Sequence, residues 1–276
     1  MSPTVIGLAL FAAALHATWN AALRTGADRL RAVTVMSLAT TLVAIPFAIL
    51  LPAPRAAAWP YLTLSSCLQV GYSIFLVLAY QRGELGQVYP IVRGSVPLLV
   101  TLGGFLFAEQ QPTAPQLIGV VLVALGVVSL SIGKQRAPMQ PVLLALATAL
   151  IIASYATTDA VGVHRAGNPL AYATWLFLIY GALMPTAFVA IRGTLRLDIR
   201  SAETLKALAG GVVSLMAYGA VVSAFALGPA GPISALRETS VIFAAVIGRA
   251  FLNEALTIRR VFACIVVGLG AACLSS

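Results

Sequence analysis

Ten long apolar segments dominate this sequence, and they leave few folds open to it. A helix that spans a membrane needs roughly 20 apolar residues. The segments are continuous rather than alternating in polarity, which indicates helices and not the strands of a membrane barrel. Only 9% of the 276 residues are charged and 60% are hydrophobic, whereas a soluble domain has about 25% charged residues. We therefore predict an all-α integral membrane protein with ten transmembrane helices, multi-pass in the lipid bilayer of the cell (inner or plasma) membrane. The expected spans are Thr4–Leu23, Val33–Leu51, Tyr61–Tyr80, Leu85–Phe107, Gln116–Ile132, Pro141–Val163, Leu170–Ile191, Leu205–Leu227, Gly231–Leu252 and Arg260–Leu274.

An internal duplication relates the two halves of the chain. A shift of 145 residues, without a gap, matches seven positions of 79–109 with 224–254. Five spans per half is an odd number, so the second half must enter the membrane from the opposite side. This predicts a 5+5 inverted repeat, with the substrate site near the midplane between the repeats. We assign 1–133 to the first repeat, 134–140 to a linker and 141–276 to the second repeat. The matched pairs are Ala79 with Ala224, Gly83 with Gly228, Gly86 with Gly231, Ser95 with Ser240, Val96 with Val241, Gly103 with Gly248 and Glu109 with Glu254.

The basic residues are distributed unequally between the two membrane faces. Twelve Lys and Arg lie in the connections after the first, third, fifth, seventh and ninth spans, and only Arg55 and Arg165 lie on the other face. Because cytoplasmic loops carry the excess of Lys and Arg, we expect both termini outside the cytoplasm. The same distribution explains the basic pI near 10 without a nucleic-acid partner.

Neither a metal nor another cofactor is expected. The three cysteines lie inside apolar segments without C-x-x-C spacing, which is typical of small buried apolar residues. The sequence contains no G-x-S-x-G, H-E-x-x-H or G-x-x-x-x-G-K motif, so a membrane-embedded enzyme is unlikely. The oligomeric state is not readable, and a monomer is sufficient for the predicted site.

Two motifs and the two-fold layout resemble a known family. The motifs are L-H-A-T-W-N-A at 15–21 and A-Y-Q-R-G-E-L-G-Q-V-Y-P at 79–90. Glu109 and Glu254 close the fourth and ninth spans, each with a threonine a few residues later. The chain resembles the drug/metabolite transporter superfamily, EamA-type branch. The resemblance implies transport of a small metabolite, often amino acid export, through a central cavity.

The chain departs from its relatives in two respects. Related proteins are often drawn with both termini in the cytoplasm, opposite to the orientation that the basic residues predict. The small multidrug transporters rely on a carboxylate in the first membrane helix, and Thr4–Leu23 contains none. This difference weakens a drug-cation antiport function.

Four charged residues at membrane depth are the main candidates for a substrate site. They are Arg93, Asp159, Arg237 and Glu238. A charge at the centre of a membrane helix costs about 2.5–3.5 kcal/mol on insertion scales, so such residues usually face a cavity or a partner. Arg93 or Arg237 suits a carboxylate, because guanidinium binds it bidentately, and Glu238 or Asp159 suits a cation or a proton. The alternative is a structural ion pair that lets the helices insert.

Counting residues from the helix ends places the remaining polar candidates in two half-cavities. One contains His16, Trp19, Asn20 and Tyr89 with Arg93, and the other contains Tyr155 and Asp159 with Arg237 and Glu238. Tyr72 and Tyr218 are further candidates for the lining. The alternatives are an interfacial position for the aromatic residues and a simple hydrogen bond within the bundle for the histidine. Pro90 and Pro97 predict a kinked and locally open fourth helix beside the arginine.

These features together predict a secondary active transporter that works by alternating access. We expect it to move a small polar metabolite, and an amino acid, exported, is the best candidate. A zwitterion that spans Arg93 and Glu238 fits this pair of charges better than a dianionic phosphosugar. A nucleotide-sugar or sugar-phosphate exchanger and a multidrug-type cation transporter are the alternatives within transport.

Overall fold

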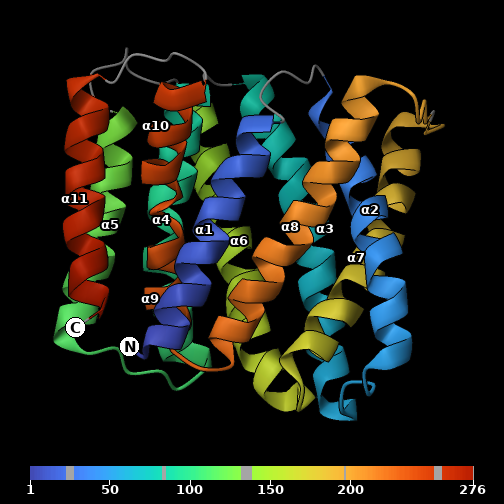
Figure 1. Cartoon of the computed structure of the whole chain (residues 1–276), viewed down its shortest axis with the longest axis horizontal. Helices are drawn as coiled ribbons and strands as arrows, with labels where there is room; N and C mark the ends of the chain where they lie inside the picture. Colours follow the sequence, from blue (N-terminus) through green and yellow to red (C-terminus); the bar gives the residue numbers. More distant parts are fainter. Residues whose placement is uncertain (23–27, 83–84, 132–138, 196, 252–256, 276) are drawn as a thin grey trace.

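The computed structural model shows a bundle of antiparallel helices (Figure 1). It describes residues 1–22, 28–82, 85–131, 139–195, 197–251 and 257–275, and their side chains except at 19–22, 80, 85–87 and 251. The described residues contain no strand, which confirms the all-α prediction. The helices are α1 (Pro3–Ala22), α2 (Arg29–Leu50), α3 (Trp59–Arg82), α4 (Leu85–Phe107), α5 (Ala114–Val128), α6 (Met139–Ala166), α7 (Pro169–Arg192), α8 (Ala202–Phe225), α9 (Ala230–Arg237), α10 (Ser240–Phe251) and α11 (Ile258–Ser275), with short 3₁₀ turns η1 (Ala56–Ala58) and η2 (Ser129–Ser131).

The helices supply the predicted ten membrane spans. Nine stretches of the described residues are long and apolar enough to cross a membrane, and α9 and α10 together form one of them. The tenth is α1, whose helix has 20 residues. Large apolar side chains cover the outside, such as Ile49 at 80% and Phe107 at 73% exposure. These side chains face the lipid, as expected for a multi-pass membrane protein.

The helix packing has the symmetry of an inverted repeat. Both termini lie at the same face, here called the lower face, and α1, α3, α7 and α10 end at the opposite, upper face (Figure 1). The first helix of each half packs against the third helix of the other half: α1 against α8, and α6 against α3. Equivalent helices also pair with one another, namely α2 with α7, α5 with α11 and α4 with α9. Exchanging the halves leaves this pattern unchanged, so the two five-helix halves are related by a pseudo-twofold axis.

Small residues allow the fifth helices of the two halves to approach closely. A Cβ atom at Gly119 of α5 would lie 2.8 Å from the Gly270 carbonyl oxygen of α11, and a Cβ atom at Gly270 would lie 2.9 Å from the Gly119 oxygen. Neither position has room for a side chain. Helices in a membrane associate by such close contact, because lipid gives no hydrophobic drive for them to pair.

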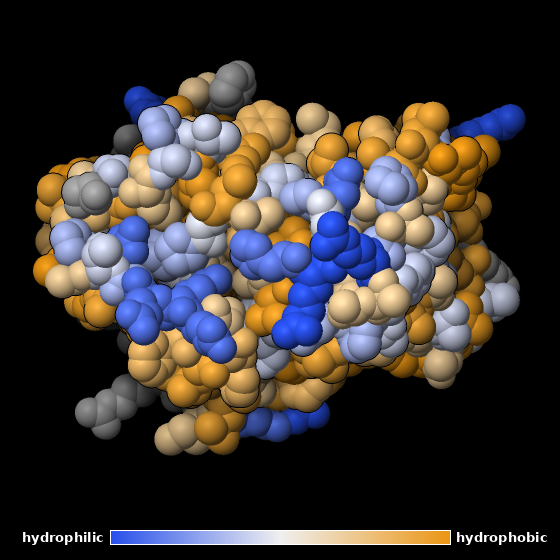
Figure 2. Space-filling view, turned by 90° about the horizontal axis from the view of Figure 1, so that it is seen from below, coloured by the Kyte–Doolittle hydropathy of each residue, from blue (hydrophilic) through white to orange (hydrophobic). Residues whose placement is uncertain are grey.

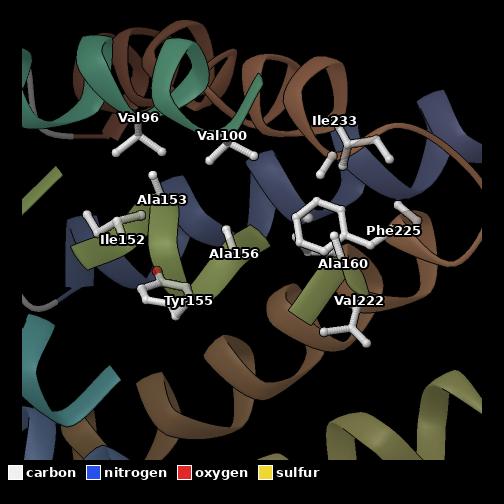
Figure 3. Packing of buried hydrophobic residues seen from close by; sticks show 14 of the residues in the cluster. Val96, Val100, Ile152, Ala153, Tyr155, Ala156, Ala160, Val222, Phe225 and Ile233 are labelled. Atoms are coloured by element: carbon white, nitrogen blue, oxygen red, sulfur yellow. The ribbon is translucent and has the colours of Figure 1, made fainter. Parts of the chain in front are cut away.

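A dense apolar core extends through the bundle, from Ala79 and Val88 towards the upper face to Val5 and Phe225 towards the lower face. Val96 and Val100 of α4 face Ala153 and Ala156 of α6, and Phe225 lies between neighbouring helices (Figure 3). Val5, Ala9, Leu62, Ala160, Val222, Phe225 and Ile233 are all at most 1% exposed. Hydrophilic residues gather across the middle of the lower surface, with apolar side chains around them (Figure 2). The core therefore separates the interior of the bundle from the lower face.

The ninth and sixth spans differ from their predictions. The ninth span, predicted as one helix over Gly231–Leu252, is divided into α9 and α10 between Arg237 and Ser240. The fourth span has the predicted bounds, Leu85–Phe107, and this helix includes both Pro90 and Pro97. The sixth span begins at Met139, inside the predicted linker 134–140, of which 134–138 lie outside the described residues.

Candidate transport site

A buried ion pair joins the two halves at the centre of the bundle. The Nε atom of Arg93, on α4, lies 2.9 Å from the Oε2 atom of Glu238, at the end of α9. Arg93 is 7% exposed and Glu238 is 1% exposed. Counting residues from the helix ends predicted that these groups lie on opposite sides of the midplane. They nevertheless meet, because α4 packs against α9 and both side chains are long enough to cover the difference in depth.

The break between α9 and α10 places Glu238 at the end of a half-helix. Glu238 donates its backbone N–H to Ala235 (3.0 Å), and Thr239 donates to Leu236 (3.1 Å). These i→i−3 bonds tighten the last turn and end the helix. The Thr239 hydroxyl donates to the same Leu236 oxygen at 2.6 Å. The negative end of the α9 dipole thus lies near Arg93, which favours the guanidinium. Discontinuous helices of this kind form ion and substrate sites in transporters.

The ion pair leaves hydrogen-bonding capacity unused. Among the described residues, Arg93 Nε, Arg93 Nη2 and Glu238 Oε2 are buried and have no hydrogen-bond partner. The short Nε–Oε2 distance is therefore a charge contact without the alignment of a hydrogen bond. Most buried polar atoms in proteins have a partner, so each exception needs an explanation. A bound ligand with a carboxylate and an ammonium group could provide the missing partners.

A row of aromatic rings lies beside the charges. Tyr72 packs on Tyr155 with ring centroids 5.9 Å apart, and Tyr155 packs on Tyr218 at 6.1 Å. Phe177 continues the row at 6.1 Å from Tyr218. The Arg237 guanidinium carbon lies 5.9 Å from the centre of the Tyr218 ring, within the range of a cation–π contact. The rings come from α3, α6, α8 and α7, and they give the site one aromatic wall.

A second buried carboxylate lies beyond this row. Asp159 of α6 is completely buried. It accepts a hydrogen bond from the Tyr172 hydroxyl at 2.8 Å and another from the Tyr218 hydroxyl. Tyr172 and Phe177 were not among the predicted site residues, because one aromatic residue in an apolar helix has no signal that distinguishes it from core.

The two predicted half-cavities are linked at one point, because Arg93 of one lies against Glu238 of the other. The charges of Arg93 and Arg237 both act on His16 and on Tyr72. Tyr89 lies one helical turn before Arg93, on the same face of α4. Trp19 and Asn20 belong to α1, and their side chains lie outside the described residues. The long side chains and the pairing of α4 with α9 bring the two predicted groups together.

The described residues also contain a surface depression away from this site, and they contain no candidate metal site. A surface depression of about 500 Å³ at the upper face contains none of the predicted site residues, and lies between Asp28 and Arg31 at the start of α2 and Phe188 and Arg192 at the end of α7. Among the described residues, no group of three or more His, Cys, Asp or Glu is arranged to hold a metal ion.

Comparison with known proteins identifies the family. The EamA-like transporter family matches the chain twice, over residues 3–132 and 139–276. The chain belongs to the EamA-like transporter family. This family is part of the drug/metabolite transporter superfamily, so the protein is a membrane transporter of that type.

A solved structure shares the fold of this EamA-like protein. One crystal structure is similar over 98% of this chain and 94% of its own, with 18% sequence identity and a TM-score of 0.77. At this identity the similarity shows the fold alone. No curated protein matches the chain.

Proposed function

We propose that this protein is a secondary active transporter that exports amino acids across the cell (inner or plasma) membrane by alternating access. The observation that carries the proposal is the buried Arg93–Glu238 pair with its unused hydrogen-bonding atoms. A zwitterionic amino acid placed between the two residues would put its carboxylate on the guanidinium and its ammonium on the glutamate. One ion pair would thus be replaced by two.

The charges of the cluster favour this substrate over the alternatives. A dianionic phosphosugar would be repelled by Glu238, and both arginines would repel a cationic drug. Arg237 lies beside Tyr218 and directly before Glu238 in the chain, so it adds to the positive charge that a cationic drug would meet. The row from Tyr72 to Phe177 would receive the apolar part of a side chain.

Alternating access needs a site that can be reached from each face in turn. The apolar core around Val5, Ile233 and Phe225 closes the lower side. The division between α9 and α10 provides a point at which one half of the ninth span can move without the other. Movement at this break would open the lower side while the pair stays near the midplane.

Counterflow in proteoliposomes tests the proposed function. Vesicles containing the purified protein are loaded with one unlabelled compound and diluted into the same radiolabelled compound. We expect transient accumulation with neutral L-amino acids, and none with glucose 6-phosphate, UDP-glucose or tetraphenylphosphonium. Accumulation of a phosphosugar or of the lipophilic cation alone would contradict the proposal. Vesicles without protein correct for leakage.

A further inference from the structure

Asp159 differs from the other buried charges because no cation neutralises it directly. It is completely buried in the middle of the bundle, two turns before the end of α6 at the lower face. Among the described residues, no Lys, Arg or His nitrogen lies within 4.0 Å of its carboxylate. Its hydrogen-bond partners are the hydroxyl groups of Tyr172 and Tyr218, and the buried Ser65 hydroxyl of α3 bonds to it as well.

The helices around Asp159 present phenols to it and keep the arginines farther away. Tyr172 comes from α7 and Tyr218 from α8. Tyr155 lies one turn earlier on α6 itself, and Tyr72 of α3 packs on the Tyr155 ring. Helix α3 also presents the Ser65 hydroxyl to Asp159. From α9, Arg237 lies over the ring of Tyr218. Glu238 also belongs to the ninth span, and it forms an ion pair with Arg93 of α4, so these two charges neutralise one another.

This environment suits a group that gains and loses a proton. An ionised carboxylate in a membrane interior is costly without a counter-charge, and protonation removes that cost. Two phenol donors can stabilise the ionised form, so both forms can be held. Buried carboxylates of this kind form proton relays in pumps and transporters.

We propose that Asp159 binds and releases the proton whose gradient drives transport, which rests on the proposed function. The Asp159 carboxylate takes up one proton from water on one side of the membrane and gives it up on the other. No other bond is formed or broken. Tyr218 links this event to the substrate, because its hydroxyl touches Asp159 while its ring touches Arg237. The contrary reading is that the carboxylate only ties α6, α7 and α8 together.

Protonation can be measured without any substrate. Infrared difference spectra of the reconstituted protein are recorded between acidic and alkaline pH. We expect a carbonyl band of a protonated carboxylic acid that disappears as the pH rises. This band should be absent in Asp159→Asn and retained in Asp198→Asn, whose side chain lies on an exposed loop. A wild-type spectrum without such a band, or a band that persists in Asp159→Asn, would overturn the proposal.

Coupling is measured by accumulation under a pH gradient, with the membrane potential held at zero by valinomycin and equal potassium. One pH unit across the vesicle membrane supports about a ten-fold concentration ratio when one proton moves per substrate. With an equimolar mixture of radiolabelled L-amino acids, we expect a ratio of about ten for wild type and Asp198→Asn, and about one for Asp159→Asn.

The outcomes separate this inference from the proposed function. Wild-type protein without counterflow for any amino acid would contradict transport, and the infrared band would still report on Asp159. Wild-type counterflow with no response to the pH gradient would contradict the proton role and leave transport intact. Both results come from wild-type protein, so the test stands even if Asp159→Asn fails to fold. Gradient-driven accumulation by a folded Asp159→Asn protein would show that this carboxylate is structural.

Discussion

Arg93 and Glu238 occupy the same place in the two halves of the chain, and they contact each other across the pseudo-twofold axis at 2.9 Å. A shift of 145 residues relates the two positions in the sequence. Helices α4 and α9 are equivalent elements that pair at the axis, so equivalent positions near their crossing point face one another. A contact between symmetry-related positions is the general property of an interface on a two-fold axis. The ion pair is therefore a consequence of the inverted repeat.

Removing either charge of the pair should abolish transport. In Arg93→Ala or Glu238→Gln the substrate loses a charge-assisted contact of about 1.5–3 kcal/mol, which corresponds to roughly ten- to hundred-fold weaker affinity. Uptake in proteoliposomes, normalised to folded protein by size-exclusion chromatography, measures the loss. We expect each single variant to remain inserted and folded.

The combination of both substitutions separates a substrate site from a structural ion pair. If the charges bind substrate, the double variant should be as inactive as the single variants. If they only hold the helices together, the single variants should misfold, and the double variant should fold and transport. Full transport by the double variant would show that neither charge touches the substrate.

Loss of the Tyr172 hydroxyl should destabilise the protein. Tyr172→Phe leaves a buried carboxylate with one donor fewer, at a cost of about 1–3 kcal/mol. Thermal unfolding in detergent should therefore begin at a lower temperature. Tyr61→Phe is the matched control, because the ring keeps its contact with Arg165 at 5.3 Å. Equal unfolding temperatures for the two variants would mean that the bond to Asp159 does not contribute to stability.

A methyl group at Gly231 should disturb the contact between α9 and α4. Its Cβ atom would lie 2.7 Å from the Cα atom of Thr101, a backbone atom that cannot rotate away. Overpacking of this kind costs typically about 1–3 kcal/mol. Gly219→Ala is the control, since a Cβ atom there has nothing within 4 Å and alanine favours a helix by about 1 kcal/mol. Unfolding temperatures should fall for Gly231→Ala only.

The orientation in the membrane can be tested with single cysteines. Residue 198 lies at the upper face and residue 168 at the lower face. Each is replaced by cysteine, one at a time, in a protein without its native cysteines. Because basic residues dominate the upper connections, we expect a cysteine at Asn168, and not one at Asp198, to react with an impermeant maleimide in intact cells. Labelling at 198 alone would reverse the orientation and leave the inverted repeat unaffected.

Most of the fold could be predicted from apolar segments and the repeat. Continuous apolar runs located all ten spans, since a span must be apolar over its whole length. The division of the ninth span was missed, because its sequence there contains Arg237, Glu238 and Thr239 but no proline or glycine. The fourth span was predicted with the bounds that the structure shows, Leu85–Phe107, although it contains Pro90 and Pro97.

The charged residues of the site were identifiable, but their partners were not. Arg93, Asp159, Arg237 and Glu238 stand out because charges are rare at membrane depth. Their arrangement depends on which helices cross at the axis, and a count of residues from helix ends carries no such information. Tyr172 could not be found for the same reason, since its role depends on the position of α7 beside α6.

The position of the Arg93–Glu238 pair on the axis has a consequence for any protein built from two separate copies of one half. Identical subunits would place two arginines or two glutamates against each other at this point, and like charges in a membrane interior repel strongly. A single chain escapes this constraint, because each half can carry its own residue at the shared position. Fusion of the halves is thus what permits opposite charges, and with them a binding site that distinguishes the two ends of its ligand.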